Sequence, residues 1–151
     1  MTPQELIGAA LEEARAAGEA GEVPIGAVIV RQGTIVGRGA NRTVRDNDAT
    51  THAEMVAIRD ASRAVGSWRL EGCTLVVTVE PCAMCAGAIV LARIDRVIFG
   101  AWDEKAGMAG SIADLLRHPR LNHRPEVLAG VREEECATLI REFFRARRPV
   151  R

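Results

Sequence analysis

Thr51-His52-Ala53-Glu54 and Pro81-Cys82-Ala83-Met84-Cys85 are the two stretches around which this chain is organised, and 26 residues separate them. Each stretch follows a loop or a strand-like run and precedes a helical pattern, so each is expected to form the first turn of a helix. Cys82 and Cys85 are three residues apart, which puts both on one helix face. If the two helices are neighbours on a sheet, the histidine, the glutamate and both cysteines converge on one point.

These residue types in this order predict a zinc site. His52, Cys82 and Cys85 are suitable ligands, because zinc binds imidazole nitrogen and thiolate sulfur, and a catalytic site keeps a fourth position open for water. Glu54 is then free to move protons to and from the water that zinc activates. His-x-Glu followed by Pro-Cys-x-x-Cys is the signature of zinc-dependent nucleobase deaminases. It predicts that water attacks an amine-bearing ring carbon and that ammonia leaves.

Two structural interpretations stay open beside this one. Thr51-x-x-Glu54 is also a helix capping box, which on its own favours a structural role. The zinc could instead sit in a closed structural site, which needs a fourth protein ligand. Cys73 begins a strand that carries it ~20 Å from the site end, at ~3.3 Å per residue, and Cys136 lies on an apolar helix stripe, so both are expected in the core. A fourth ligand from His118 or His123 would leave the glutamate without a role.

Hydrophobic periodicity predicts an α/β fold in one domain spanning residues 1–151. The apolar run at 25–30 is expected to be a strand buried on both faces, and the turn at Gln32-Gly33 makes it a hairpin with the next strand. Two strand–helix–strand units then predict a partly parallel sheet covered by helices. One helix is expected to start at Pro3, and further helices are expected at 52–65, 81–93, 111–116 and 131–148, with Ser111 as the cap of the short one. The expected strands cover 25–30, 34–40, 73–79, 96–99 and 126–128.

Composition points to a cytoplasmic globular protein rather than a membrane or secreted one. The 151 residues are 48% hydrophobic and 26% charged, with a net charge of zero. We expect no membrane span, because no apolar run approaches the ~18 residues that a span requires, and residues 1–5 lack the basic start of a signal peptide. Four cysteines, two of them in a metal-type pair, fit a reducing compartment. Residues 141–151 carry five arginines and one glutamate, 5 − 1 = +4, which could meet phosphates.

Several further motifs carry a resemblance that covers nearly the whole chain. They are His52-Ala53-Glu54, the run at 78–88, the loop at 107–111, His118-Pro119-x-x-Asn122-His123-Arg124 and the ending Phe143-Phe144-Arg145-x-Arg147-Arg148. With these motifs the chain resembles the bacterial tRNA-specific adenosine deaminases, within the cytidine-deaminase-like superfamily. The resemblance implies a three-layer α/β/α fold with a mixed five-stranded sheet, a homodimer, and one zinc ion per subunit. It also implies conversion of adenosine to inosine at the wobble position of a tRNA anticodon stem-loop, with the target base splayed out of the loop.

The resemblance also assigns roles to individual residues. His52, Cys82 and Cys85 match the zinc ligands, and Glu54 matches the proton shuttle. Seven further residues match substrate contacts: Asn41 for the flipped base, Asp103 and Lys105 near the RNA backbone, Asn122 and His123 for neighbouring nucleotides, and Phe144 and Arg148 on the last helix. Trp102 departs from the basic or polar residue that the resemblance leads us to expect in its loop.

Two other functions compete with this interpretation. One is a deaminase of a free nucleobase or nucleoside, such as guanine, cytosine or cytidine. Such an enzyme has no need of the basic C-terminal helix with Phe143 and Phe144, although a core stripe with one outward ring is the simplest explanation of those two residues. The other is a non-catalytic, zinc-stabilised RNA-binding module, in which Glu54 would have no chemical role.

Overall fold

The computed structural model describes residues 1–147. None of the helices in this range is both long enough and apolar enough to cross a membrane. The elements, in chain order, are α1 Pro3–Glu19, β1 Gly26–Arg31, β2 Thr34–Ala40, α2 Ala53–Val65, β3 Cys73–Val79, α3 Ala83–Leu91, β4 Arg96–Ala101, β5 Glu126–Leu128 and α4 Glu133–Arg147.

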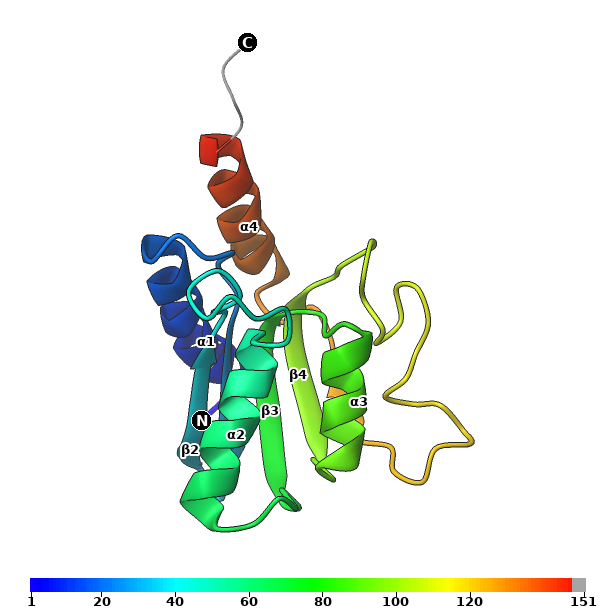
Figure 1. The fold of residues 1–151 in the computed structure, drawn as a ribbon. Helices are drawn as coiled ribbons and strands as arrows, with labels where there is room; N and C mark the ends of the chain where they lie inside the picture. The colour runs from blue at the N-terminus through cyan, green and yellow to red at the C-terminus, as the bar shows by residue number, and fades with distance from the viewer. Residues whose placement is uncertain (148–151) are drawn as a thin grey trace.

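The strands form one mixed sheet in the order β2-β1-β3-β4-β5 (Figure 1). Gln32 and Gly33 both have positive φ, at 50° and 76°, as a two-residue hairpin turn requires, and they connect β1 to the antiparallel β2. β1 also pairs antiparallel with β3, whereas β3, β4 and β5 run parallel. The predicted hairpin and the predicted partly parallel sheet are confirmed.

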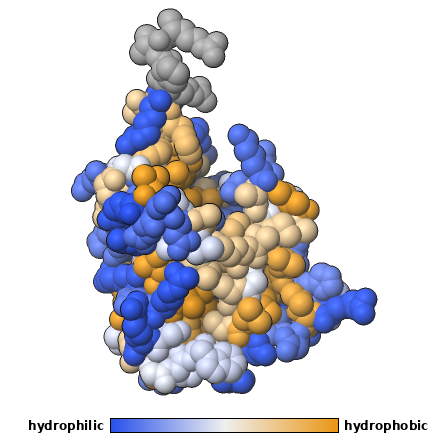
Figure 2. All heavy atoms as spheres, viewed as in Figure 1, coloured by the Kyte–Doolittle hydropathy of each residue, from blue (hydrophilic) through white to orange (hydrophobic). Residues whose placement is uncertain are grey.

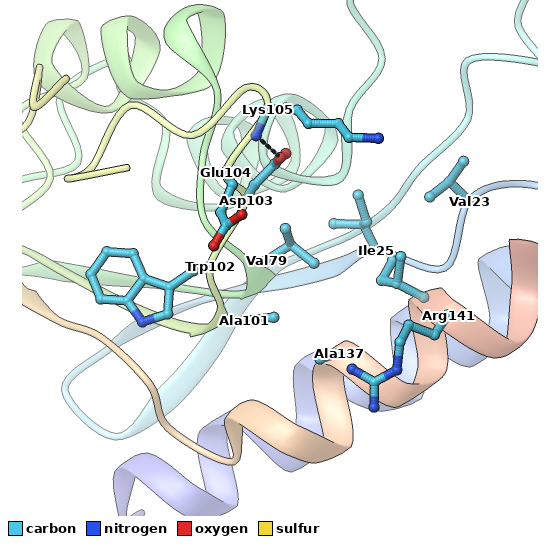
Figure 3. Close-up of a pocket in the computed structure, with 11 residues that line it drawn as sticks. Val23, Ile25, Val79, Ala101, Trp102, Asp103, Glu104, Lys105, Ala137 and Arg141 are labelled. Atoms are coloured by element: carbon cyan, nitrogen blue, oxygen red, sulfur yellow. Dashed lines mark hydrogen bonds between the residues drawn. The ribbon is translucent and has the colours of Figure 1, made fainter. Parts of the chain in front are cut away.

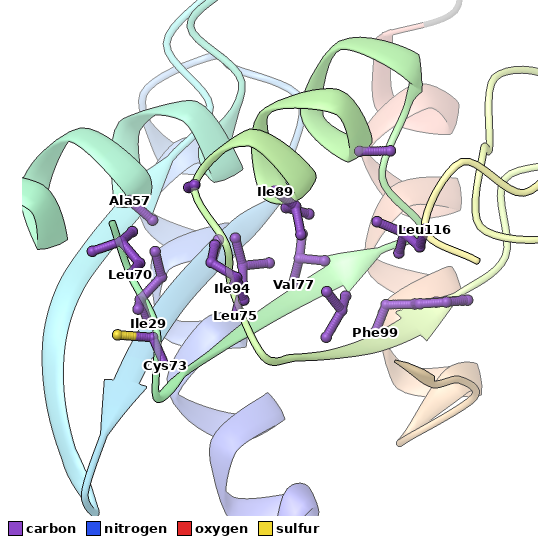
Figure 4. Close-up of a cluster of buried hydrophobic side chains, with 14 of the residues drawn as sticks. Ile29, Ala57, Leu70, Cys73, Leu75, Val77, Ile89, Ile94, Phe99 and Leu116 are labelled. Atoms are coloured by element: carbon purple, nitrogen blue, oxygen red, sulfur yellow. The ribbon is translucent and has the colours of Figure 1, made fainter. Parts of the chain in front are cut away.

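Helices cover both faces of the sheet, which confirms the three-layer α/β/α prediction (Figure 1). Alternate strand residues point to opposite faces, so Ile29 and Leu75 pack under α2 and α3, whereas Val28 and Val76 pack under α1 and α4. Figure 4 shows the first of these two cores, in which Phe99 and Leu116 continue the apolar layer beyond α3. Five of the six residues of β1 are buried, as the apolar run predicts.

Two glycines let α2 lie unusually close to β2. A Cβ atom added at Gly39 would sit 2.1 Å from the carbonyl oxygen of Ala53, and one added at Gly37 would sit 2.6 Å from that of Ala57. A real Cβ atom cannot approach backbone this closely, so only glycine permits the packing. Ala53 is the first residue of α2. Gly39 therefore fixes the distance between β2 and the start of α2, where His52 and Glu54 lie.

One predicted element is wrong: residues 111–116 form turns and an isolated bridge between Ala109 and Asp114 instead of a short helix. The Ser111 hydroxyl was expected to cap this helix, but it donates a hydrogen bond to Glu80, and the Ser111 N–H donates to the same carboxylate. These two bonds to a distant acceptor hold Ser111 in the loop, where no helix follows it. The last helix begins at Glu133 rather than 131, and its predicted end, Arg148, lies outside the described residues.

Candidate active site

His52, Cys82 and Cys85 meet at one end of the sheet. His52 is the N-cap of α2, Cys82 is the N-cap of α3, and Cys85 lies in the first turn of α3. The Nδ1 atom of His52 is 3.5 Å from the Sγ atom of Cys82 and 3.6 Å from that of Cys85. All three donor atoms lie within 4.8 Å of one another. The predicted convergence of two helix starts is therefore what the fold produces.

The three donors fit a zinc ion in both chemistry and spacing. Bonds of ~2.3 Å to sulfur and ~2.0 Å to nitrogen, arranged as a tetrahedron, separate nitrogen from sulfur by ~3.5 Å. Within residues 1–147, the donor group at this point has these three members and no fourth side chain. His123 Nε2 instead lies 2.6 Å from the carbonyl oxygen of Ile94, and His118 Nδ1 accepts a hydrogen bond from the Arg120 N–H. Three protein ligands are the number that a catalytic zinc site uses.

Glu54 lies beside this cluster in the first turn of α2, and only 4% of it is exposed. Burial raises the pKa of the Glu54 carboxyl to about 7, although the nearby His52 opposes the shift. A carboxyl group with this pKa can both accept and donate a proton near neutral pH. A residue that served only as a helix cap would not need to be buried beside two thiols, so the geometry favours proton transfer.

The thiols of Cys82 and Cys85 have pKa values that are shifted in opposite directions. A hydrogen bond from Cys85 and the neighbouring His52 together lower the pKa of Cys82 to about 3, although burial opposes the shift. The same contact with Cys82 and the burial of Cys85 raise the pKa of Cys85. Without a cation, Cys82 is therefore the thiolate and Cys85 holds its proton. A dication that binds both sulfurs must displace this proton, so metal binding at the cluster depends on pH.

A cavity of about 210 Å³ opens onto His52 and Glu54. This volume is small beside the ~300–1,000 Å³ of pockets for drug-sized ligands. Asn41 lines the same cavity, and its Oδ1 atom is buried without a hydrogen-bond partner among the described residues. Buried polar atoms without partners are rare in proteins, and here the atom belongs to a residue that lines a space for a ligand. The predicted base-binding asparagine is therefore in the same cavity as the predicted proton shuttle.

A second cavity of about 400 Å³ adjoins the first, because Val23 and Ile25 line both. Figure 3 shows its lining, with Asp103 and Lys105 on one side and α4 on the other. The Lys105 N–H donates a hydrogen bond to the Asp103 carboxylate at 3.1 Å, which stabilises the turn of this loop. The two predicted RNA-contact residues of this loop thus lie next to the cavity that holds Glu54.

The other predicted contact residues lie elsewhere. Asn122 is exposed, and His123 contacts Ile94 before the start of β4, whereas the zinc ligands lie near the opposite end of that strand. Phe144 is 47% exposed and packs edge-on against Phe143 of α4. Arg148 lies outside the described residues. The structure thus brings together the zinc ligands, Glu54 and Asn41, with the loop of Asp103 and Lys105 beside them, but not Asn122 and His123.

Trp102 belongs to the loop that follows β4. Its ring packs edge-on against Phe99 with 5.0 Å between ring centroids. The side chain is 44% exposed, so part of the ring still meets solvent. The ring therefore packs the start of the loop against β4. This is a structural role for Trp102, which the sequence alone did not indicate.

Two buried acids that no sequence motif singled out shape the site. Glu80 is 3% exposed and accepts hydrogen bonds from the backbone N–H groups of Asp103, Ala109 and Ser111 at 2.9–3.0 Å. Although burial opposes it, the hydrogen bonds from Ser111, Asp103 and Ala109 lower the pKa of Glu80. Glu22, also buried, binds the loop after β2 in a similar way. An acid at the end of an apolar run was the only available signal for Glu80.

The fold and the donor cluster together define a zinc-binding deaminase. Residues 1–101 match the cytidine and deoxycytidylate deaminase zinc-binding region, which is two thirds of the chain. The His/Cys/Cys group that this class requires is present and is positioned to bind one metal ion.

Three comparisons narrow the class. A tRNA-specific adenosine deaminase of Bacillus subtilis (strain 168) is 51% identical over 146 residues, which cover 96% of this chain and 91% of that protein. Another, from Agrobacterium fabrum, is 50% identical over 92% of this chain and 91% of its own length. A solved structure from a study of A-to-I editing by tRNA:A34 deaminases at the wobble position of transfer RNA is 47% identical. It has a TM-score of 0.86 and matches 89% of this chain and 98% of its own. The chain belongs to the family of tRNA-specific adenosine deaminases.

Proposed function

We propose that this protein converts adenosine to inosine at the wobble position of a tRNA anticodon loop, by zinc-dependent hydrolysis. One observation supports this most directly: Glu54 and Asn41, whose buried Oδ1 atom has no hydrogen-bond partner among the described residues, line one small cavity beside the His52, Cys82 and Cys85 cluster. The overall reaction consumes water and releases ammonia, so the amine of the base is replaced by a carbonyl oxygen. Membership of the family and the relatives' names support tRNA as the substrate.

Adenine can supply the hydrogen-bond donor that the Oδ1 atom of Asn41 lacks. The amide of an asparagine can contact the N6 and N7 atoms of adenine at the same time, with its oxygen accepting and its nitrogen donating. The buried Oδ1 atom would accept a hydrogen bond from the base. Because an acceptor without a partner is costly to bury, this bond favours a purine that carries an amine at this edge.

Glu54 moves protons in the proposed mechanism. Its carboxylate takes a proton from the attacking water and delivers it to the ring nitrogen, and a second transfer protonates the leaving amine. A pKa of about 7 suits both directions at neutral pH. When held by His52, Cys82 and Cys85, zinc supplies Lewis acidity that makes a water reactive at this pH. Burial of Glu54 keeps bulk water away from these transfers.

The RNA around the flipped base would lie over the second cavity. Lys105 brings positive charge to its rim, and Arg141 on α4 faces it from the other side. Asp103 fixes the loop that presents Lys105. Phe144 offers an exposed ring farther along α4 for stacking on a flanking base, and we expect Arg148 to extend this basic end. The predicted RNA contacts of Asn122 and His123 stay predictions, because neither residue lines these cavities.

We further propose that two copies form a homodimer through α3. This helix is apolar almost all round, and Leu91 at its end is 69% exposed. Figure 2 shows mostly hydrophobic surface where α3 faces the viewer. A contiguous exposed apolar patch of this kind marks an interaction site. The chain would act as a single domain in each subunit, because one sheet carries all the described helices, and a tRNA substrate would place it in the cytoplasm.

The test of the proposed function is inosine formation on defined substrates. The protein is incubated with an anticodon stem-loop that carries adenosine at the wobble position and, separately, with free adenosine, cytidine and guanine. We expect inosine in the stem-loop alone. Conversion of a free compound alone would contradict the proposal and favour the rival free-base or nucleoside deaminase.

A further inference from the structure

Glu22 is a buried acid that neither metal binding nor proton transfer uses. It lies in the turn after α1 with 0% exposure. One carboxylate oxygen accepts a hydrogen bond from the Val44 N–H at 3.0 Å, and the other accepts one from the Arg45 N–H at 2.7 Å. The Nε atom of Arg45 also lies 3.6 Å from the second oxygen. Burial of a carboxylate is costly unless such bonds satisfy it, so both oxygens are committed to residues 44 and 45.

The loop that Glu22 holds forms a wall of the base cavity. Asn41 and Thr43 line this cavity, and so does Val23, the residue after Glu22. At one end of the loop the Asn41 N–H donates to the carbonyl oxygen of Ile25, and the Arg42 N–H donates to that of Thr51 next to the zinc cluster. Glu22 therefore ties the middle of the loop to the segment that carries Val23 and Ile25, which also line the cavity.

The negative charge of Glu22 strengthens its hydrogen bonds to Val44 and Arg45. Burial alone would raise the pKa of Glu22, but hydrogen bonds from Val44 and Arg45, together with the charge of Arg45, lower it overall. Glu22 is therefore ionised at neutral pH, and an ionised acid can accept hydrogen bonds with both oxygens at once. Hydrogen bonds to a charged acceptor are about twice as strong as those between neutral groups.

We propose that Glu22 is a positioning residue for the base: its carboxylate holds residues 43–45 so that Thr43 and Asn41 form the cavity wall before the RNA arrives. This inference rests on the proposed function. A loop that is released part of the time leaves only a fraction of molecules ready to bind, and the apparent affinity falls by that fraction. Glu22 therefore contributes to KM rather than to the chemical step, which Glu54 carries.

Glu22→Gln is the decisive variant, because it keeps the size of the side chain. The amide retains one acceptor oxygen, but its NH2 group faces either the Val44 or the Arg45 N–H, which is a donor facing a donor. Loss of one such bond corresponds to roughly a tenfold change in an equilibrium. We expect the amide hydrogens of Val44 and Arg45 to exchange about tenfold faster. On a wobble-adenosine stem-loop, KM should rise ~3–10-fold with kcat within ~2-fold.

Glu19→Gln is the matched control, because it removes the same charge from the exposed end of α1, and exchange and KM should be unchanged in it. If Glu22→Gln folds poorly, as judged by thermal unfolding and zinc content, Glu22→Asp tests the same tie with the charge kept and the reach shortened. Exchange at Val44 and Arg45 equal to that of the unmodified protein would overturn the anchoring role. Faster exchange with an unchanged KM would overturn the substrate role. Failure of the unmodified protein to form inosine would sink the proposed function, whereas the exchange result would still decide the anchoring.

Discussion

Replacement of Glu80 with alanine should destabilise the protein far more than replacement of an exposed acid in the same region. Glu80 accepts four hydrogen bonds from three residues: the N–H groups of Asp103, Ala109 and Ser111, and the Ser111 hydroxyl. The Ala109 N–H is buried, and a buried donor without an acceptor costs ~1–3 kcal/mol. The other three donors regain water, and the loss of each of their bonds costs ~0.5–1 kcal/mol.

These contributions add up to ~2.5–6 kcal/mol, a large part of the ~5–15 kcal/mol stability of a typical domain. Urea unfolding followed by circular dichroism measures the loss as a lower midpoint at an unchanged slope. Glu104→Ala is the matched control, because Glu104 is exposed in the same loop, and it should change the stability by less than ~0.5 kcal/mol. Equal midpoints for Glu80→Ala and Glu104→Ala would refute the idea that this carboxylate holds the loop.

Three further predictions follow from packing, charge and surface. Gly39→Ala should lower zinc affinity, measured by metal titration, because its Cβ atom would meet the Ala53 backbone at 2.1 Å and displace the start of α2; wild-type affinity would contradict this. The raised pKa of Glu54 means that this group contributes stability to the metal-free protein that is fully present below pH 4.5 and is lost as pH rises through about 7, a trend in urea midpoints between these values that Glu54→Gln should flatten. Leu91→Arg should convert a dimer to monomers in analytical ultracentrifugation, whereas the exposed Glu12→Arg should not; a persistent dimer would move the interface away from α3.

The zinc cluster could be predicted from the sequence because its signal is local. His52 and Glu54 lie within three residues, and Cys82 and Cys85 lie within four, so one helix start presents each pair. The apolar runs of β1 and β3 then leave few alternatives for where the two helix starts meet. The same locality explains why the hairpin turn at Gln32-Gly33 was predicted correctly.

The contacts between distant residues could not be predicted in this way. Ser111 looks like a helix cap until Glu80, 31 residues earlier, takes its N–H and its hydroxyl. Glu22 looks like a solvated acid after a helix until the loop 22 residues later folds over it. His123 contacts the carbonyl oxygen of Ile94 only because the long loop between β4 and β5 folds back toward the sheet. In each case tertiary packing determines the hydrogen-bond partner, and a local sequence pattern does not report how distant segments pack.

The central claim is that Glu54 moves protons beside a zinc ion held by His52, Cys82 and Cys85. Its most direct test is zinc content and inosine formation measured together on Glu54→Gln. We predict one zinc per chain, as in the unmodified protein, with a rate of inosine formation on the wobble-adenosine stem-loop lower by at least ~10²–10⁴-fold. Undiminished inosine formation by a variant that retains its zinc would contradict the claim.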